Sequence, residues 1–403
     1  MTQIYDIGIV GAGVAGAFAA LKIAHSHKGL KTLIIEAGRP SRKRRTQMQG
    51  FIGLLPNSDG KLYLNDMLDV AEVTTKIKTA NAFNWFKSST EEVLNFSVIK
   101  DKSPSINTEK RIKKAGFKVK LNNHIQLFPQ EIHNLSKFIS DQIEEKENIT
   151  SVFDVEVQKV VKEKGHFVIT TETEQYKCKR VLVAVGRSGW RWVSELFQGL
   201  GLVEDNDYAD IGIRVETTDT VMRDFNHSNC SISRDDLSIG PLSWNGTVIP
   251  EDHFDMVISA FRGNENRWHS NKVSFNLLGK RLFKNLGVEQ ASRIGQLTFI
   301  LTNDRVAKEK ISTLLSKKSK LSIMHEYDWL RDSVSEISNF IPEIATKGYF
   351  HFPTMMPMAS KIKLGTNFSS ELDGLYVAGE SARVPGILGA ITSGIIAGEN
   401  LCK

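Results

Sequence analysis

Cysteine, proline and long apolar runs are scarce in this sequence, and each shortage excludes a class of protein. The 403 residues include only 3 cysteines, Cys178, Cys230 and Cys402, with no C-x-x-C pair. A disulfide framework, a zinc site and a dithiol redox centre are therefore excluded. The low count of 10 prolines and the lack of any biased tract exclude collagen-like and disordered chains. No apolar run approaches the roughly 18 to 20 residues that a membrane-spanning helix needs.

Neither sign of charge dominates. Lys and Arg number 52 and Asp and Glu 46, which leaves a net charge of +6. This mild excess favours an anionic small-molecule substrate over nucleic acid as the partner. The densest basic cluster contains Arg39, Arg42, Lys43, Arg44 and Arg45. Since no aromatic residues interleave with it, a solvated loop beside a cofactor phosphate is favoured over an RNA-binding patch.

The overall composition is that of a globular protein. Hydrophobic residues make up 41% and charged residues 24%, close to the average of soluble chains. The length corresponds to two or three domains. The first residues enter an apolar run without the basic stretch and small-residue cleavage site of a signal peptide. We therefore expect a cytoplasmic protein without a membrane span, and the sequence leaves its oligomeric state open.

The amino-terminal segment combines an apolar strand pattern with a glycine-rich turn. Residues 4–10 form a β-branched apolar run that ends in Gly11-Ala12-Gly13-Val14-Ala15-Gly16, a G-x-G-x-x-G. Small and apolar residues at helical spacing follow, and a second apolar run ends in Glu36-Ala37. This order predicts a βαβ unit that binds a dinucleotide. Gly11 permits the tight turn, Gly13 lets the backbone approach a pyrophosphate, and Gly16 allows close helix packing.

The predicted helix and Glu36 indicate which kind of dinucleotide is bound. The helix amino terminus presents unpaired N–H groups and a positive dipole end to phosphates. Glu36 lies 20 residues after Gly16 and is placed to accept hydrogen bonds from both ribose hydroxyls. Because a carboxylate there disfavours a 2′-phosphate, we predict a nucleotide of the FAD or NAD type.

A second glycine-rich turn lies near the other end of the chain. Residues 373–378 have the pattern of a turn and a short strand, and Gly379 and Glu380 follow. The segment Gly386-Ile387-Leu388-Gly389-Ala390 then leads into an apolar helix with small residues. A second helix amino terminus is therefore expected to face the ligand.

This carboxyl-terminal pattern resembles the second flavin-binding segment of the glutathione-reductase-like FAD superfamily. The resemblance implies that Glu380 lies near the ribityl chain and that the helix after Gly386 faces the flavin pyrimidine. A positive helix end there would stabilise the negative charge of a reduced flavin. The resemblance implies FAD as the cofactor.

Two further segments resemble motifs of the same superfamily. Residues 179–189, which include Ala184 and Gly186, resemble its middle motif, an apolar strand that ends in Ala-x-Gly. Residues 151–157 resemble the strand whose backbone holds the adenine, with Val157 at the contact position. With these motifs in the expected order, the resemblance implies an α/β fold with a Rossmann-like FAD-binding domain.

Three stretches are similar to the bacterial FAD-dependent dehydrogenases, most of which have no assigned substrate. They are residues 53–62, which end in Ser58-Asp59-Gly60-Lys61-Leu62, the turn at residues 186–189 with the following Trp190, and the strand pattern at residues 210–216. The resemblance implies that the Ser-Asp-Gly-Lys turn lies near the isoalloxazine ring. Lys61 would then be a cation that stabilises the reduced flavin. An ordinary turn with a solvent-exposed lysine is the alternative.

The middle of the chain is expected to form a substrate domain. No second G-x-G-x-x-G follows a strand between residues 195 and 345, so NAD(P)H is expected only as a transient co-substrate. We predict an inserted α+β substrate domain at 191–345 and a segment at 76–109 that is either a mobile cap or a surface subdomain. The discontinuous FAD-binding domain is assigned to residues 1–75, 110–190 and 346–403.

Local patterns within the substrate domain predict individual elements. Strands are expected at 211–215, 255–259 and 297–301, because each is a short apolar run. Helices are expected at 306–315 and 328–340, the second ended by Pro342.

Two residues of this domain are candidates for substrate chemistry. Arg262 comes at the end of an expected strand, before Gly263, and could hold a substrate carboxylate with two parallel hydrogen bonds. His351 precedes the final flavin segment and is the best candidate for a general base, although a packing histidine is the competing interpretation. His227, His253 and His269 have no spacing that indicates a metal site.

Three functions remain open at this point. The first is an FAD-dependent oxidoreductase that transfers hydride between a small organic substrate and flavin N5, as dehydrogenase, reductase or oxidase. The second is an FAD-dependent RNA-modifying enzyme, which the basic cluster at residues 39–45 motivates. The third is a non-catalytic flavoprotein that serves as a binding or redox-sensing module.

Overall fold

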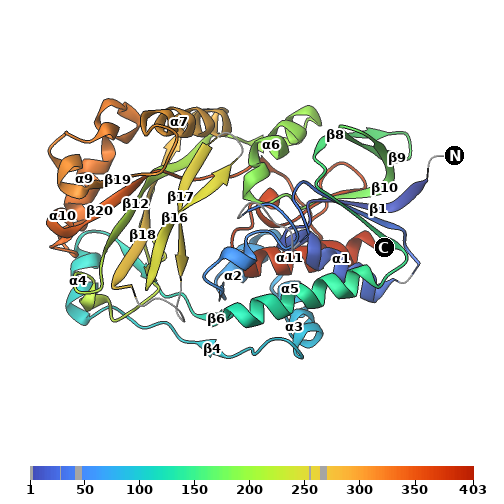
Figure 1. Cartoon of the computed structure of the whole chain (residues 1–403), viewed down its shortest axis with the longest axis horizontal. Coiled ribbons are helices and arrows are strands. Elements are labelled where there is room, and N and C mark those ends of the chain that lie inside the picture. The colour runs from blue at the N-terminus through green and yellow to red at the C-terminus, as the bar shows by residue number, and fades with distance from the viewer. Residues whose placement is uncertain (1–2, 28, 41–47, 254–255, 264–269) are drawn as a thin grey trace. The chain divides into compact units, whose positions relative to one another are not determined.

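The computed structural model divides into two compact units (Figure 1). It describes residues 3–27, 29–40, 48–253, 256–263 and 270–403, without the side chains of residues 252, 262 and 263. Unit 1 contains Met1–Val98, Ile125–Asn206 and Met358–Lys403, and unit 2 contains Ile99–His124 and Asp207–Pro357. The domain limits expected from the sequence, with their assignment to cofactor and substrate, stay a prediction.

Unit 1 is built on a parallel sheet that includes the predicted βαβ unit. Strand β1 (Ile4–Val10) leads through helix α1 (Val14–Ser26) to strand β2 (Thr32–Glu36), which confirms that prediction. The parallel order is β7-β2-β1-β10, and β22 pairs with β10 on the other side. β7 is Ile149–Phe153, β10 is Gln175–Val183 and β22 is Leu375–Val377. β2 is buried along its whole length, as expected for a parallel strand that is covered on both faces.

The first half of β10 belongs to an antiparallel meander. It pairs with β9 (His166–Thr171), which pairs in turn with β8 (Val157–Glu163). The remaining strands of unit 1 are short. These are β3 (Lys61–Tyr63), β11 (Val203–Asp205) and β21 (Lys361–Ile362), while β4 (Val98–Ile99) and β6 (His124–Gln126) lie where the chain passes between the units.

Helix α11 (Ile387–Leu401) packs along α1 by means of small residues. A side chain at Gly394 would lie 2.2 Å from the carbonyl oxygen of Ala15, and one at Gly398 would lie 2.7 Å from that of Ala19. The backbones therefore approach more closely than larger residues would allow. The other helices of unit 1 are α2 (Asp66–Val73), α3 (Lys76–Thr90), α5 (Pro129–Glu144) and α6 (Trp190–Gly199).

Residues 76–109, the segment expected as a cap or surface subdomain, contribute to both units. Helix α3 packs in unit 1, where the ring of Phe86 is fully buried and meets Phe18 of α1 edge to face at 5.3 Å. Residues 99–109 fall in unit 2, where they include the start of α4 (Ile106–Lys114).

Unit 2 is dominated by an antiparallel sheet whose strand order differs from the order along the chain. Its strand order is β19-β20-β12-β18-β14-β13-β5, and β15 also pairs with β18. β16 (Gly246–His253) and β17 (Met256–Gly263) pair antiparallel in a separate sheet. The sheet strands are β5 (Lys118–Lys120), β12 (Tyr208–Thr218), β13 (Ser231–Arg234), β14 (Leu237–Ile239), β15 (Ser243–Trp244), β18 (Lys272–Leu282), β19 (Ala307–Lys310) and β20 (Tyr349–Met356).

The helices of unit 2 correct two predictions and confirm one. Residues 297–301, expected as a strand, end helix α7 (Gly287–Leu301), because buried residues recur at helical spacing from Val288 to Thr298. Residues 306–315, expected as one helix, divide into β19 and the short α8 (Ile311–Leu315). The expected helix at 328–340 is confirmed by α9 (Trp329–Ile337), and α10 (Ile344–Lys347) follows.

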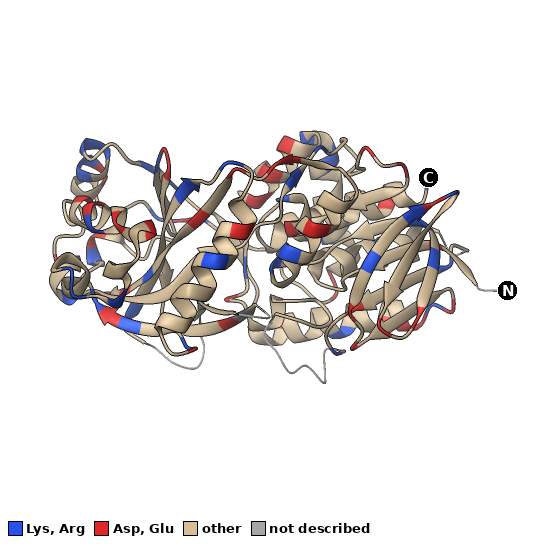
Figure 2. Ribbon diagram, turned by 90° about the horizontal axis from the view of Figure 1, so that it is seen from above, with Lys and Arg blue, Asp and Glu red and all other residues tan. Residues whose placement is uncertain are grey.

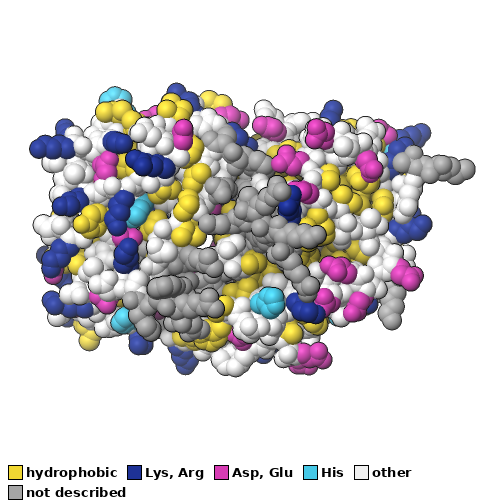
Figure 3. All heavy atoms as spheres, viewed as in Figure 1, with side chains coloured by type: hydrophobic (Ala, Val, Ile, Leu, Met, Phe, Trp, Pro, Cys, Tyr) yellow, Lys and Arg dark blue, Asp and Glu magenta, His cyan; other side chains and the backbone are white. Residues whose placement is uncertain are grey.

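The exposed surface is mixed in character. Basic and acidic residues are interspersed along the described ribbon in Figure 2. On the face shown in Figure 3, hydrophobic side chains lie in small groups among charged and uncharged polar ones. Within the described ranges, no helix combines the length and the apolar character that crossing a bilayer requires.

Candidate functional site

The glycine-rich turn after β1 uses two of its glycines for its own fold. Gly11 has φ +95°, and a side chain there would lie 2.8 Å from the carbonyl oxygen of Ala184. A side chain at Gly16 would lie 1.9 Å from the carbonyl oxygen of Gly11. Both positions therefore require glycine for reasons internal to the chain.

Gly13 differs, because no described part of the chain requires glycine at this position. Its backbone is extended, with φ −61° and ψ −175°. A methyl group added at Gly13 would have the carbonyl oxygen of Ala184 as its nearest described atom, at 3.9 Å. Helix α1 begins at the next residue, Val14, and Gly13 supplies no side-chain cap. The open space thus lies at a helix amino terminus, where unpaired N–H groups attract phosphate.

Glu36 holds the loops around this turn together. Its Oε2 accepts a hydrogen bond of 2.7 Å from the backbone N–H of Ala12, and its Oε1 accepts bonds of 2.9 Å from those of Gly38 and Gly50. The side chain is 7% exposed. Three of the about four acceptor positions of the carboxylate are therefore used within the chain. Acceptance of both hydroxyls stays a prediction.

The second glycine-rich turn lies against the first. Gly379 has φ +64°, and a side chain there would lie 3.0 Å from the Cβ atom of Ala15 in α1. The N–H of Gly379 donates to Oγ of Ser393 in α11 at 3.0 Å. Two segments separated by more than 360 residues therefore meet within unit 1, as one extended ligand would need.

The middle motif joins both turns. The N–H of Ala184 donates to the carbonyl of Val10 at 2.9 Å, and the N–H of Ala378 donates to the carbonyl of Val183 at 3.0 Å. Beyond this strand, Nη2 of Arg187 lies 2.7 Å from Oε1 of Glu380. Glu380, expected beside the ribityl chain, is thus half-buried and paired with a cation that the sequence did not assign to this site.

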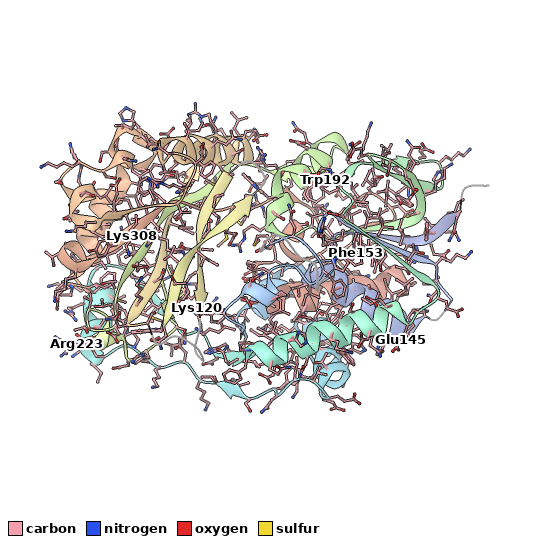
Figure 4. The ribbon with its side chains drawn as sticks, in the orientation of Figure 1. Lys120, Glu145, Phe153, Trp192, Arg223 and Lys308 are labelled. Atoms are coloured by element: carbon pink, nitrogen blue, oxygen red, sulfur yellow. The ribbon has the colours of Figure 1, made fainter. Side chains whose placement is uncertain are left out.

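The remaining expected cofactor residues also lie in unit 1. Gly386 precedes α11, and Ile387, Leu388, Gly389 and Ala390 form its first turn. Gly186, after β10, has open space at its Cα within the described chain. Ala37 follows β2, and Val157 begins β8. Phe153, labelled in Figure 4 at the end of β7, packs edge to face on Phe51 at 6.2 Å.

Lys61 is a buried residue rather than a solvent-exposed one. It is 4% exposed, and its Nζ lies 3.5 Å from Oδ2 of Asp59. Gly60 sits between them with φ +72°, where a side chain would lie 2.1 Å from the carbonyl oxygen of Leu127. The turn is therefore built against a neighbouring segment of unit 1, and the alternative of an ordinary exposed lysine is wrong.

His351 lies in a charged cluster of unit 2. Its Nε2 is 3.4 Å from Oε2 of Glu216. Nζ of Lys308, labelled in Figure 4, donates a hydrogen bond to Oε1 of Glu216, and Nζ of Lys272 lies 3.6 Å from the same oxygen. Burial would raise the pKa of Glu216, but the bonds from His351 and Lys308 lower the pKa to about 2. The ionised carboxylate can thus orient the imidazole of His351.

Several predictions remain without a structural test. Lys61 belongs to unit 1, whereas His351 and Arg262 belong to unit 2, so their convergence on a substrate stays a prediction. The side chain of Arg262 lies outside the described residues. In the basic cluster, Arg39 pairs with Asp154 at 3.2 Å. Positions 42–45 lie outside the described residues, so RNA binding also stays a prediction.

Three residues of interest were not assigned a role from the sequence. Asp66 lies beside Gly386, Arg187 pairs with Glu380, and Glu216 faces His351. The alternation along 210–216 could have indicated that Glu216 shares a strand face with Arg214. No local pattern indicates the partners of Asp66 and Arg187, because these contacts join distant segments. In the described part of the chain, no group of three metal-ligating side chains is present.

Comparison with known proteins yields structural similarity without a family. No protein-family model and no curated protein matches the chain. Glycine oxidase from Geobacillus kaustophilus is 13% identical, with 99% of this chain and 95% of that chain covered and a TM-score of 0.46. Pyridoxine 4-oxidase from Mesorbium loti is 11% identical, with 98% and 99% covered and a TM-score of 0.48.

A third similar structure is PqsL of P. aeruginosa in complex with 2-aminobenzoylacetate. It is 12% identical, with 99% of this chain and 86% of that chain covered and a TM-score of 0.42.

Proposed function

We propose that unit 1 binds FAD and that the chain is an FAD-dependent oxidoreductase acting on a small organic substrate. The observation that carries the proposal is Gly13. No described part of the chain requires glycine at this position, which lies at the amino terminus of α1. A pyrophosphate that approaches the backbone closely would require glycine there.

The position of the second turn supports FAD over NAD. Gly379 packs on Ala15 of the first glycine-rich motif, which supports a single ligand site at both turns. A ligand that spans both would extend from the adenosine end, near Glu36, to the amino terminus of α11. FAD is a dinucleotide of that type, and it supplies hydride chemistry when bound.

The roles of the chain's own residues follow from their chemistry. The N–H groups of residues 14–16 would hold the pyrophosphate, and Glu36 would accept a ribose hydroxyl. Lys61, as a buried cation, would offset negative charge on the reduced cofactor. His351, oriented by Glu216 at 3.4 Å, would take or give the substrate proton at its Nδ1 atom. Arg262 would bind an anionic group of the substrate.

Anaerobic loss of the visible flavin absorbance tests catalysis directly. The FAD-loaded chain is mixed with NADH, NADPH or a panel of amines, hydroxy acids and cyclic alkenes. Rapid bleaching by any one of them is expected, and it would identify the electron donor. A chain that binds FAD but is bleached by none of these compounds would favour the non-catalytic module instead.

A further inference from the structure

An acidic side chain lies against the beginning of α11. Asp66 is the first residue of α2. A Cβ atom built on Gly386 would lie 2.1 Å from Oδ2, 2.3 Å from Cγ and 2.7 Å from Oδ1 of Asp66. The carboxylate therefore fills the space where a side chain at position 386 would be. Gly386 is the residue that immediately precedes the helix.

Two glycines, Gly386 before α11 and Gly389 in its first turn, leave room for this carboxylate. Gly386 has φ +83°, which itself favours glycine, and a side chain at Gly389 would lie 3.5 Å from the Cβ atom and the carbonyl oxygen of Asp66. The Oδ2 atom of Asp66 is buried. The first turn of α11 contains no acidic residue of its own, and Gly386 gives it no side-chain cap. Asp66 thus brings a negative charge to this helix end from another element.

The position of Asp66 matters because of what a helix amino terminus provides. Such an end carries roughly half a positive charge, which attracts anions within the first turn. A carboxylate fixed there offsets part of that charge. An anionic ligand group at the same end consequently meets a weaker positive field than the helix alone would give.

We propose that Asp66 keeps the reduction potential of the bound flavin low. This inference rests on the proposed function, in which the amino terminus of α11 faces the flavin pyrimidine. Oxidised flavin that takes up two electrons and one proton gains one negative charge, and part of that charge lies on the pyrimidine. Asp66 disfavours this reduced state relative to the oxidised one, so it acts as a positioning residue for charge rather than as a catalytic residue.

The test compares the reduction potentials of bound FAD in the full chain and its variants. Xanthine and xanthine oxidase supply the electrons, and a dye of known potential reports the equilibrium. Asp66→Asn keeps the size of the side chain and removes its charge. We expect this variant to bind reduced relative to oxidised FAD at least tenfold better, which for a two-electron couple raises the potential by about 30 mV.

Glu72→Gln is the matched control. Glu72 is exposed on the same helix, and the substitution makes the same change in net charge, so the potential should stay at the wild-type value. Asp66→Ala provides a second test in case the asparagine variant does not fold, and its potential should shift in the same direction. The titration is accompanied by thermal unfolding, because a merely structural role would change stability without moving the potential.

The outcomes separate this inference from the proposed function. If the wild-type chain binds no FAD, the proposed function fails, and this inference fails with it. If the wild-type chain binds FAD and a folded Asp66 variant has the wild-type potential or a lower one, only the role of Asp66 is overturned. An equal rise in the Glu72→Gln control would also overturn it, since the effect would then be one of net charge.

Discussion

The three glycines of the amino-terminal turn are there for three different physical reasons. Gly11 serves a backbone with positive φ, Gly16 serves the packing of α1 on the turn, and Gly13 leaves space that no described part of the chain fills. The sequence motif assigned the roles of Gly11 and Gly16 correctly. For Gly13 the ligand itself is the predicted cause, so substitution can separate binding from folding.

Gly13→Ala should weaken FAD binding while it leaves the fold intact. Its methyl group would lie 3.9 Å from the nearest described atom, so the free energy of unfolding should fall by less than about 1 kcal/mol, as for an unfavourable residue before a helix. We expect the dissociation constant for FAD, measured by flavin fluorescence, to rise at least tenfold.

Gly16→Ala is the matched comparison. Its methyl group would lie 1.9 Å from the carbonyl oxygen of Gly11, so it should lower the free energy of unfolding by about 1–3 kcal/mol or more. Urea denaturation measures both variants. Unaltered FAD affinity in Gly13→Ala would mean that no ligand group approaches this position.

Glu216 should make the free energy of unfolding depend on pH in the acidic range. Its pKa of about 2 in the folded chain lies below the ordinary value of 4.5, so its stabilising effect is complete above about pH 5 and disappears as the pH falls towards 2. At pH 7, Glu216→Gln should lower the free energy of unfolding by about 1–3 kcal/mol, because His351 and Lys308 lose their partner. Urea denaturation across this pH range measures the difference from wild type.

The difference between wild type and Glu216→Gln should shrink as the pH falls from 5 towards 2. Glu195→Gln, at an exposed position within α6, should change stability by less than about 0.5 kcal/mol at any pH. A constant difference for Glu216→Gln over the whole range would contradict the assignment of the low pKa to this residue.

At the scale of elements, long patterns predicted structure better than short ones. The βαβ unit from β1 to β2 was predictable, because an apolar run, a glycine motif and a helical pattern occur in sequence. The five residues at 297–301 were misassigned, because a window of that length cannot distinguish a strand from the last turns of a helix. Their helical character is visible only over the whole of α7, with its buried positions from Val288 to Thr298.

The contact between α1 and α11 should depend on its small residues. A methyl group at Gly394 would lie 2.2 Å from the carbonyl oxygen of Ala15. Gly394→Ala should therefore push the helices apart and lower the melting temperature, at a cost of about 1–3 kcal/mol. Differential scanning calorimetry measures the effect.

Gly199→Ala, at the end of α6, is the control for a helical glycine. Nothing described lies within 4 Å of its added methyl group, so this variant should be neutral or stabilised by up to about 1 kcal/mol. Equal melting temperatures for Gly394→Ala and wild type would contradict this, because α1 and α11 would then accommodate the methyl group without a loss of stability.

At the scale of the whole molecule, the two units draw on separate segments of the chain. The sequence patterns indicated a discontinuous first unit, because its motifs lie at both ends. They did not indicate that residues 99–124 join the second unit, since this depends on pairing between β5 and β13, where Lys120 meets Ser231. Pairing across more than 100 residues leaves no periodic signal in either segment. The partners of two candidate site residues, Glu216 for His351 and Arg187 for Glu380, were accordingly not predictable.

Titration of the ligand-free full chain with FAD, followed by calorimetry, tests the central claim most directly. If the turns at Gly13 and Gly379 form one site for an extended dinucleotide, the chain should bind one FAD per molecule. It should bind NAD far more weakly, since NAD has no group for the amino terminus of α11. Failure to bind FAD, or tighter binding of NAD at the same site, would contradict the account.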